Sequence, residues 1–196
     1  MEVGYLINMS NLPYRCHYSS SVITKLFNRS QLTSSTNGTW NKREYDENNN
    51  FKGIVGEYFP FARKPSGLWY GFQDNWINRF NNSEELVGYL YDINIIDKSK
   101  ILSLNTDNDI LIFYKKYQLK YEDLSDMFKF MPSQFLEMFL NKSINWIKVA
   151  NDYDGIEITY KNFKFPTKEY NQWCFDWDIC SGCIWNVSNI SIKNIK

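Results

Sequence analysis

Residues 145–158, with the sequence Asn-Trp-Ile-Lys-Val-Ala-Asn-Asp-Tyr-Asp-Gly-Ile-Glu-Ile, contain a change from helix to strand that decides the fold class. Ser143 precedes a run typical of a helix, and a serine oxygen can cap the first turn by accepting from its backbone N–H groups. The Tyr-Asp-Gly run at 153–155 is a turn signal that ends this helix. Residues 156–160 have the composition of a strand, on which Glu157 points to the face opposite its two isoleucine neighbours.

On both sides of this stretch, the sequence predicts strands towards the ends of the chain and helices in the middle. The predicted strands lie within residues 3–18, 68–72, 86–96, 101–104 and 173–195, the last with a turn at 180–183. The predicted helices are 74–82, 105–117, 133–140 and 143–150. Strands around a helical middle predict a mixed α+β fold.

The composition predicts a single folded domain of residues 1–196. A hydrophobic fraction of 43%, with 18% aromatic residues, supplies enough apolar surface for one core and excludes a disordered chain. The formal net charge is zero, which argues against a protein that binds duplex DNA or an anionic membrane. The sequence has no run of 18 apolar residues and no signal-peptide pattern at its start. We therefore expect a cytoplasmic, monomeric protein without a membrane partner.

A polar segment rich in Asn, Ser, Thr and Gly covers residues 30–50. This composition and length predict a long surface loop. Loops of this length are often functional, so the segment is a candidate functional surface.

Four cysteines, at positions 16, 174, 180 and 183, are too few and too clustered for a disulfide framework in a chain of this size. We expect reduced, buried thiols and no bound metal. The alternative is a zinc site in which Cys174, Cys180 and Cys183 are joined by Cys16 or His17.

The sequence has no Walker A loop, no Gly-x-Gly-x-x-Gly run, no His-Glu-x-x-His helix and no Gly-x-Ser-x-Gly elbow. Three short patches remain as candidates. They are His17-Tyr18-Ser19 at the end of an early strand, Gly67-Leu68-Trp69-Tyr70 in the middle of the chain, and Glu157 on a late strand. Taken singly, each patch has an ordinary structural explanation. The histidine would have its hydrogen bonds made within the fold, the aromatic strand would lie in the core, and the glutamate would face solvent.

In their order and spacing, the three patches resemble the H-Y-E branch of the ADP-ribosyltransferase superfamily, which includes diphtheria-type toxins and poly(ADP-ribose) polymerases. The strand Gly67-Leu68-Trp69-Tyr70-Gly71 looks like the Gly-x-aromatic-aromatic strand of that branch. Phe80 lies 11 positions after Trp69, and Glu157 lies 90 positions after Gly67, as in the branch pattern.

Segments 64–70, 145–158 and 177–185 also look similar to uncharacterised proteins of phages, bacteria and large DNA viruses. A viral origin would place the protein in the host cytoplasm.

The resemblance implies an ADP-ribosyltransferase-like split β-sandwich of two small sheets with peripheral helices, and NAD as co-substrate. It implies that Glu157 is catalytic, since a fixed carboxylate can bind the ribose 2′-hydroxyl and stabilise the oxocarbenium-like centre formed when nicotinamide leaves. It implies that His17 assists by binding ribose. The remaining NAD-binding candidates are Tyr18, Ser19, Gly67, Trp69, Tyr70, Trp76 and Phe80, with Trp69 and Trp76 or Phe80 clamping the nicotinamide ring. Arg15, Arg63 and Lys64 are available for the pyrophosphate.

These implications predict that His17 and Glu157 lie on adjacent strands and face a common cleft, with an aromatic ring beside them. The acceptor of ADP-ribose could be a protein, a nucleic acid, a small molecule or water, and the loop at 30–50 is a candidate surface for contact with it. Two other functions remain open: a non-catalytic interaction domain on the same scaffold, in which Glu157 is exposed, and a small zinc-stabilised binding module.

Overall fold

The computed structural model describes residues 14–29, 42–45, 51–55, 64–72, 88–124, 129, 131–159, 173–174, 177 and 179–195, and the pair 42–45 and 51–55 for the backbone only. The strands are β1 (Arg15–Ser19), β2 (Lys42–Tyr45), β3 (Phe51–Val55), β4 (Leu68–Phe72), β5 (Tyr89–Ile95), β6 (Ile101–Leu104), β7 (Gly155–Ile158), β8 (Ser181–Ile184) and β9 (Ile190–Asn194). The helices are α2 (Asp107–Tyr117), α4 (Ser133–Leu140) and α5 (Trp146–Asp152), with short 3-10 turns η2 (Lys98–Lys100), η3 (Tyr121–Asp123) and η5 (Val187–Asn189).

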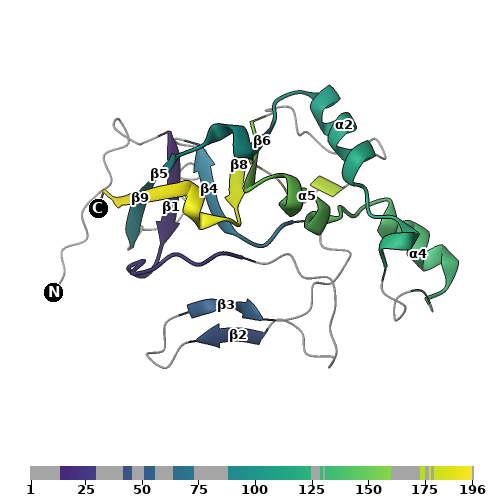
Figure 1. The fold of residues 1–196 in the computed structure, drawn as a ribbon, viewed down its shortest axis with the longest axis horizontal. Coiled ribbons are helices and arrows are strands. Elements are labelled where there is room, and N and C mark those ends of the chain that lie inside the picture. Colours follow the sequence, from purple (N-terminus) through teal and green to yellow (C-terminus); the bar gives the residue numbers. More distant parts are fainter. Residues whose placement is uncertain are drawn as a thin grey trace.

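Seven of these strands form one sheet in the order β6-β7-β8-β4-β1-β5-β9, while β2 and β3 pair with each other. Neighbours in the large sheet are antiparallel, except that β6 and β7 run parallel. Figure 1 shows α2, α4 and α5 gathered at one side of the molecule, beyond β8 and β6, with β1, β5 and β9 at the other side. The expected mixed α+β fold is confirmed.

The short link between β5 and β6 requires the large sheet to curl. These strands are consecutive in the chain but five positions apart in the sheet, which corresponds to about 24 Å in a flat sheet. The six residue steps from Ile95 to Ile101 span at most about 21 Å when fully extended, and η2 shortens that reach. Ile101 of β6 accordingly packs in one core cluster with Ile93, Ile95 and Ile190 from the other end of the sheet.

The curl gives the sheet two different faces. We call the concave face that carries Tyr70 the inner face, and the convex face that carries Ile156 the outer face. The inner cluster consists of Tyr70, Phe72, Ile93, Ile95, Ile101, Ile184 and Ile190. The outer cluster joins β6, β7 and β8 to α2 and α5, and contains the buried indoles Trp146, Trp173, Trp177 and Trp185. Helices α2 and α5 therefore cover the outer face, whereas the inner cluster is enclosed by the curl of the sheet, with Leu26 and Val187 also packed against it.

A turn at Asp154 locks the start of β7 to the end of β8. The Asp154 carbonyl accepts from the backbone N–H groups of Trp185 (3.0 Å) and Asn186 (3.1 Å). The Asn186 side chain donates to the Asp154 carboxylate at 2.8 Å, and the Trp185 indole donates to the Tyr153 carbonyl at 2.7 Å. These bonds place the two segments 145–158 and 177–185 side by side.

Several local expectations are corrected. The predicted turn at 180–183 is wrong, because Ser181–Ile184 is a fully buried strand between β7 and β4. The predicted loop at 30–50 includes the strand Lys42–Tyr45, which pairs with Phe51–Val55. The 143–150 helix starts later than predicted, since Asn145 provides its cap by accepting from the Lys148 N–H. The predicted 74–82 helix lies outside the described residues.

No helix in the part of the chain that the structure describes combines the length and the apolar character needed to cross a membrane.

Candidate functional site

A row of polar residues crosses the inner face of the sheet. Glu157 of β7 lies opposite Gly182 of β8, and Gly182 lies opposite Tyr70 of β4. The register between β1 and β4 continues this row to His17, which in turn lies opposite Tyr91 of β5. Residues directly opposite each other in a sheet share a face, so these side chains lie on one surface.

Glu157 is held by two side chains from other strands. Its Oε1 accepts from Arg15 Nε at 2.5 Å and from the Tyr70 hydroxyl at 2.7 Å, and its Oε2 accepts from Arg15 Nη2 at 3.2 Å. Only 5% of Glu157 is exposed. The carboxylate is therefore fixed in orientation by a bidentate arginine and a phenol. The expectation that Glu157 is exposed in a non-catalytic domain is wrong, because both of its oxygens are used inside the sheet.

The electrostatics of this cluster follow from burial and from the carboxylate charge. Burial lowers the pKa of Arg15, but the hydrogen bonds and the charge of Glu157 outweigh burial and leave the Arg15 pKa raised. Burial, followed by the charge of Glu157 and the hydrogen bond to it, raises the pKa of Tyr70 well above 10. Arg15 is thus a permanent cation and Tyr70 a permanent hydroxyl donor at neutral pH.

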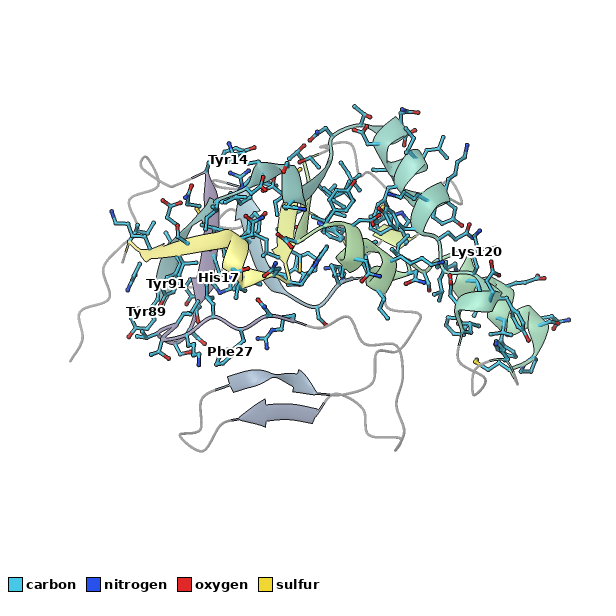
Figure 2. The ribbon with its side chains drawn as sticks, in the orientation of Figure 1. Tyr14, His17, Phe27, Tyr89, Tyr91 and Lys120 are labelled. Atoms are coloured by element: carbon cyan, nitrogen blue, oxygen red, sulfur yellow. The ribbon has the colours of Figure 1, made fainter. Side chains whose placement is uncertain are left out.

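His17 lies on the inner face, two residues after Arg15. Its Nδ1 is 2.6 Å from the Trp69 carbonyl oxygen. Since a carbonyl only accepts, Nδ1 carries the proton and Nε2 keeps a lone pair in the neutral ring. Burial lowers the pKa of His17, against the opposing effect of this hydrogen bond, and favours that neutral form. His17 is the central residue of β1 rather than a strand-end residue as predicted, and Figure 2 shows it near Tyr91, with the two ring centroids 6.4 Å apart.

The structure brings His17 and Glu157 to one face but not to adjacent strands. β8 and β4 lie between β7 and β1, so the predicted adjacency is wrong. The chain order of the motifs does not reveal this, because β8 comes from the last part of the sequence and is inserted between them.

Trp69 does not share the surface of Glu157, contrary to the expectation. Successive strand residues alternate between faces, so Trp69 lies on the outer face when Tyr70 lies on the inner one. Its indole packs on Trp177 with ring centroids 4.8 Å apart, and Lys64 Nζ lies 5.2 Å from its ring centroid. Trp76, Phe80 and Arg63 lie outside the described residues.

The other predicted NAD-binding residues have structural partners. The Tyr18 ring fills the space beside Gly88, where an added Cβ would lie 2.4 Å from the Tyr18 hydroxyl. Ser19 Oγ accepts from the Ser21 N–H at 3.3 Å. At Gly67, an added Cβ would lie 2.5 Å from Cys183 Sγ and 2.6 Å from the Ile184 carbonyl, so glycine allows β4 to approach β8.

The cysteines do not assemble into the zinc site that the alternative requires. Cys174 and Cys183 are buried in the outer cluster, whereas Cys180 packs against the inner cluster. None of the four forms a disulfide, and the described residues contain no group of three His, Cys, Asp or Glu side chains placed to hold a metal ion.

Burial makes the thiols of Cys16 and Cys174 slow nucleophiles. Burial, with a smaller effect of Asp92, raises the pKa of Cys16 to about 11, and burial raises the pKa of Cys174 to about 12. At pH 8 a thiol of pKa 11 is about one part in a thousand thiolate. We expect iodoacetamide, followed by mass spectrometry, to label half-exposed Cys180 first, and labelling of Cys16 to accelerate about tenfold per pH unit from 8 to 10. Rapid labelling of Cys16 at pH 8 in the folded protein would contradict this burial.

Sequence reasoning missed two residues on which the site depends, Arg15 of the cluster and Gly182 of β8 beside it. It assigned Arg15 to a pyrophosphate and did not pair it with Glu157, and it placed Gly182 in a turn. The signal for Arg15 was present, because strand alternation puts Arg15 and His17 on the same face. Gly182 gave no such signal, since Ser-Gly sequences are typical of turns.

Comparisons of this chain with protein-family models, with curated proteins and with solved structures give no match.

Proposed function

We propose that this protein is an NAD-dependent ADP-ribosyltransferase that cleaves the nicotinamide–ribose bond on the inner face of its sheet. The observation that carries the proposal is the carboxylate of Glu157, held by Arg15 and Tyr70 in the same polar row as His17. This placement supports the roles that the motif resemblance implies for the two residues. A preorganised carboxylate stabilises developing positive charge without a reorganisation cost during the reaction.

The proposed fold relationship is a split β-sandwich. In this view, the curled sheet corresponds to two halves, β6-β7-β8 and β4-β1-β5-β9, that face each other across the inner cluster. The packing of Ile101 with Ile93 and Ile190 supports such a closure.

The proposed reaction begins when the bond between ribose C1′ and the nicotinamide nitrogen breaks. The electron pair goes to nicotinamide, which leaves as a neutral ring, and positive charge develops at C1′. Glu157 Oε2 accepts one hydrogen bond, from Arg15, so it has a lone pair for the ribose 2′-hydroxyl. His17 would accept from a second ribose hydroxyl through Nε2. The acceptor then forms its bond to C1′ and loses a proton.

A second candidate is a non-catalytic domain in which the Arg15–Glu157–Tyr70 cluster only joins β1, β4 and β7. The near-complete burial of Glu157 favours this candidate. Both candidates use the same residues, so only binding and turnover separate them.

The direct test is NAD binding followed by nicotinamide release. A ligand present at 100 times its dissociation constant adds about 2.7 kcal/mol to the free energy of unfolding. We expect NAD to raise the thermal midpoint and the intact protein to release nicotinamide, measured by chromatography. If millimolar NAD neither raises the thermal midpoint nor yields nicotinamide, the transferase proposal is rejected and the non-catalytic domain remains.

A further inference from the structure

The Tyr70 ring reaches Glu157 across an intervening strand. Tyr70 and Glu157 lie on β4 and β7, with β8 between them. Next-but-one strands are about 10 Å apart, so a hydrogen bond between their side chains needs one long side chain and an open path. The phenol supplies the length, and its hydroxyl lies 2.7 Å from Glu157 Oε1.

Gly182 supplies the open path. It is the β8 residue directly opposite both Tyr70 and Glu157. An added Cβ at this position would lie 2.3 Å from Tyr70 Cζ and 2.4 Å from the Tyr70 hydroxyl oxygen. Atoms cannot approach so closely, so any side chain at 182 displaces the ring that contacts Glu157.

Tyr70 also fixes a degree of freedom that Arg15 leaves open. Arg15 of β1 binds both carboxylate oxygens of Glu157. Rotation of the carboxylate about the line that joins these two oxygens would keep both hydrogen bonds. The phenol binds Oε1 from a different strand, β4, and removes that rotation. Three contacts from two strands define one orientation of the carboxylate.

We propose that Tyr70 is a positioning residue for Glu157, and that Gly182 is the glycine that admits its ring. This inference rests on the proposed function, and it gives Tyr70 a role different from the direct NAD contact that the motif implies. Tyr70 acts through Glu157 and does not contact the substrate.

Tyr70→Phe tests this role, since it keeps the ring and removes the hydroxyl. A hydrogen bond to a charged group corresponds to a factor of about 10 to 100. We expect kcat for nicotinamide release to fall by about 10- to 100-fold, with KM for NAD within about threefold of the wild type. Tyr117→Phe is the matched control, because its hydroxyl also donates to a carboxylate, that of Asp152 at 2.5 Å, on the helix side of the protein. It should leave kcat unchanged.

Gly182→Ala tests whether glycine is needed to leave room for the Tyr70 ring. The same substitution is also made in a Tyr70→Leu background, which lacks the ring atoms that the new Cβ would meet. Gly182→Ala alone should lower both kcat and the urea midpoint of unfolding, because it displaces the ring. Added to Tyr70→Leu, it should change the urea midpoint little, since the colliding ring atoms are gone. If Gly182→Ala destabilises both backgrounds equally, the path is not the reason for the glycine and this part of the inference is overturned.

The outcomes distinguish this inference from the proposed function. A wild type that never releases nicotinamide overturns the proposed function and the inference with it. A wild type that is active, with Tyr70→Phe turning over within twofold of it, overturns the inference alone. A raised KM with unchanged kcat would show that Tyr70 binds NAD directly, which also overturns it.

Discussion

Glu157→Gln is expected to bind NAD and to release nicotinamide about 100- to 1000-fold more slowly than the wild type. The amide keeps the size of the side chain but removes the charge that faces the oxocarbenium-like centre in the proposed reaction. Loss of one such preorganised group costs about 2.7–4 kcal/mol in the transition state. The loss should appear in kcat, with little change in KM, because the charge at C1′ develops only during bond breakage. Single-turnover release of nicotinamide measures it.

The free energy of unfolding of this variant must be measured as a control, because Glu157 is buried in an ion pair. An exposed glutamate would tolerate the change within about 0.5 kcal/mol, whereas the pair with Arg15 predicts a clear loss in the free energy of unfolding. Rates should therefore be compared well below the thermal midpoint of the variant. Equal release by both proteins would place the catalytic carboxylate elsewhere. Asp152 and Asp154 are poor substitutes, since Asp152 binds Lys116 and Tyr117, and Asp154 belongs to the turn beside Asn186.

Arg15→Leu is expected to lower the free energy of unfolding by about 3–5 kcal/mol, the usual cost of removing one partner from a buried pair. The variant leaves Glu157, whose side chain is 7% exposed, with the Tyr70 hydroxyl as its remaining partner in the cluster. Urea denaturation at neutral pH, followed by tryptophan fluorescence, measures the loss.

The double variant Arg15→Leu/Glu157→Leu should recover most of this loss, because it removes both buried charges and fills their space with apolar side chains. Recovery would separate the cost of an unpaired charge from the value of the pair itself. If Arg15→Leu were as stable as the wild type, the 2.5 Å contact between Arg15 and Glu157 would not hold the sheet together.

The sequence predicts well those elements whose signals are local. The strand 68–72, the strand 101–104 and the helix 133–140 have the predicted bounds. The helix beginning after Thr106 is also predicted, because its capping box lies within four residues of sequence. Apolar periodicity and cap residues act over one or two turns, so a single sequence contains all of the information needed.

The candidate site depends on pairing over long separations, which no local signal encodes. Arg15 and Glu157 are 142 positions apart, and they meet only because β8 and β4 bring β7 towards β1. The location of Trp69 is different, because alternation along one strand already excludes Trp69 and Tyr70 from the same face. The motif resemblance implies that Trp69 and Tyr70 both bind NAD, whereas the strand places them on opposite faces of the sheet.

The position of β8 has a consequence for how the chain folds during synthesis. β8 lies between β7 and β4 in the sheet but is formed by residues Ser181–Ile184, late in the sequence. While β8 is still inside the ribosome, the nascent chain can form only two separate parts of the sheet, β6-β7 and β4-β1-β5. No strand then joins the one that carries Glu157 to the one that carries Tyr70. Each fragment exposes apolar residues and unpaired strand edges, which are aggregation-prone. The seven-stranded sheet and the polar cluster can therefore be completed only after Ser181–Ile184 has left the ribosome.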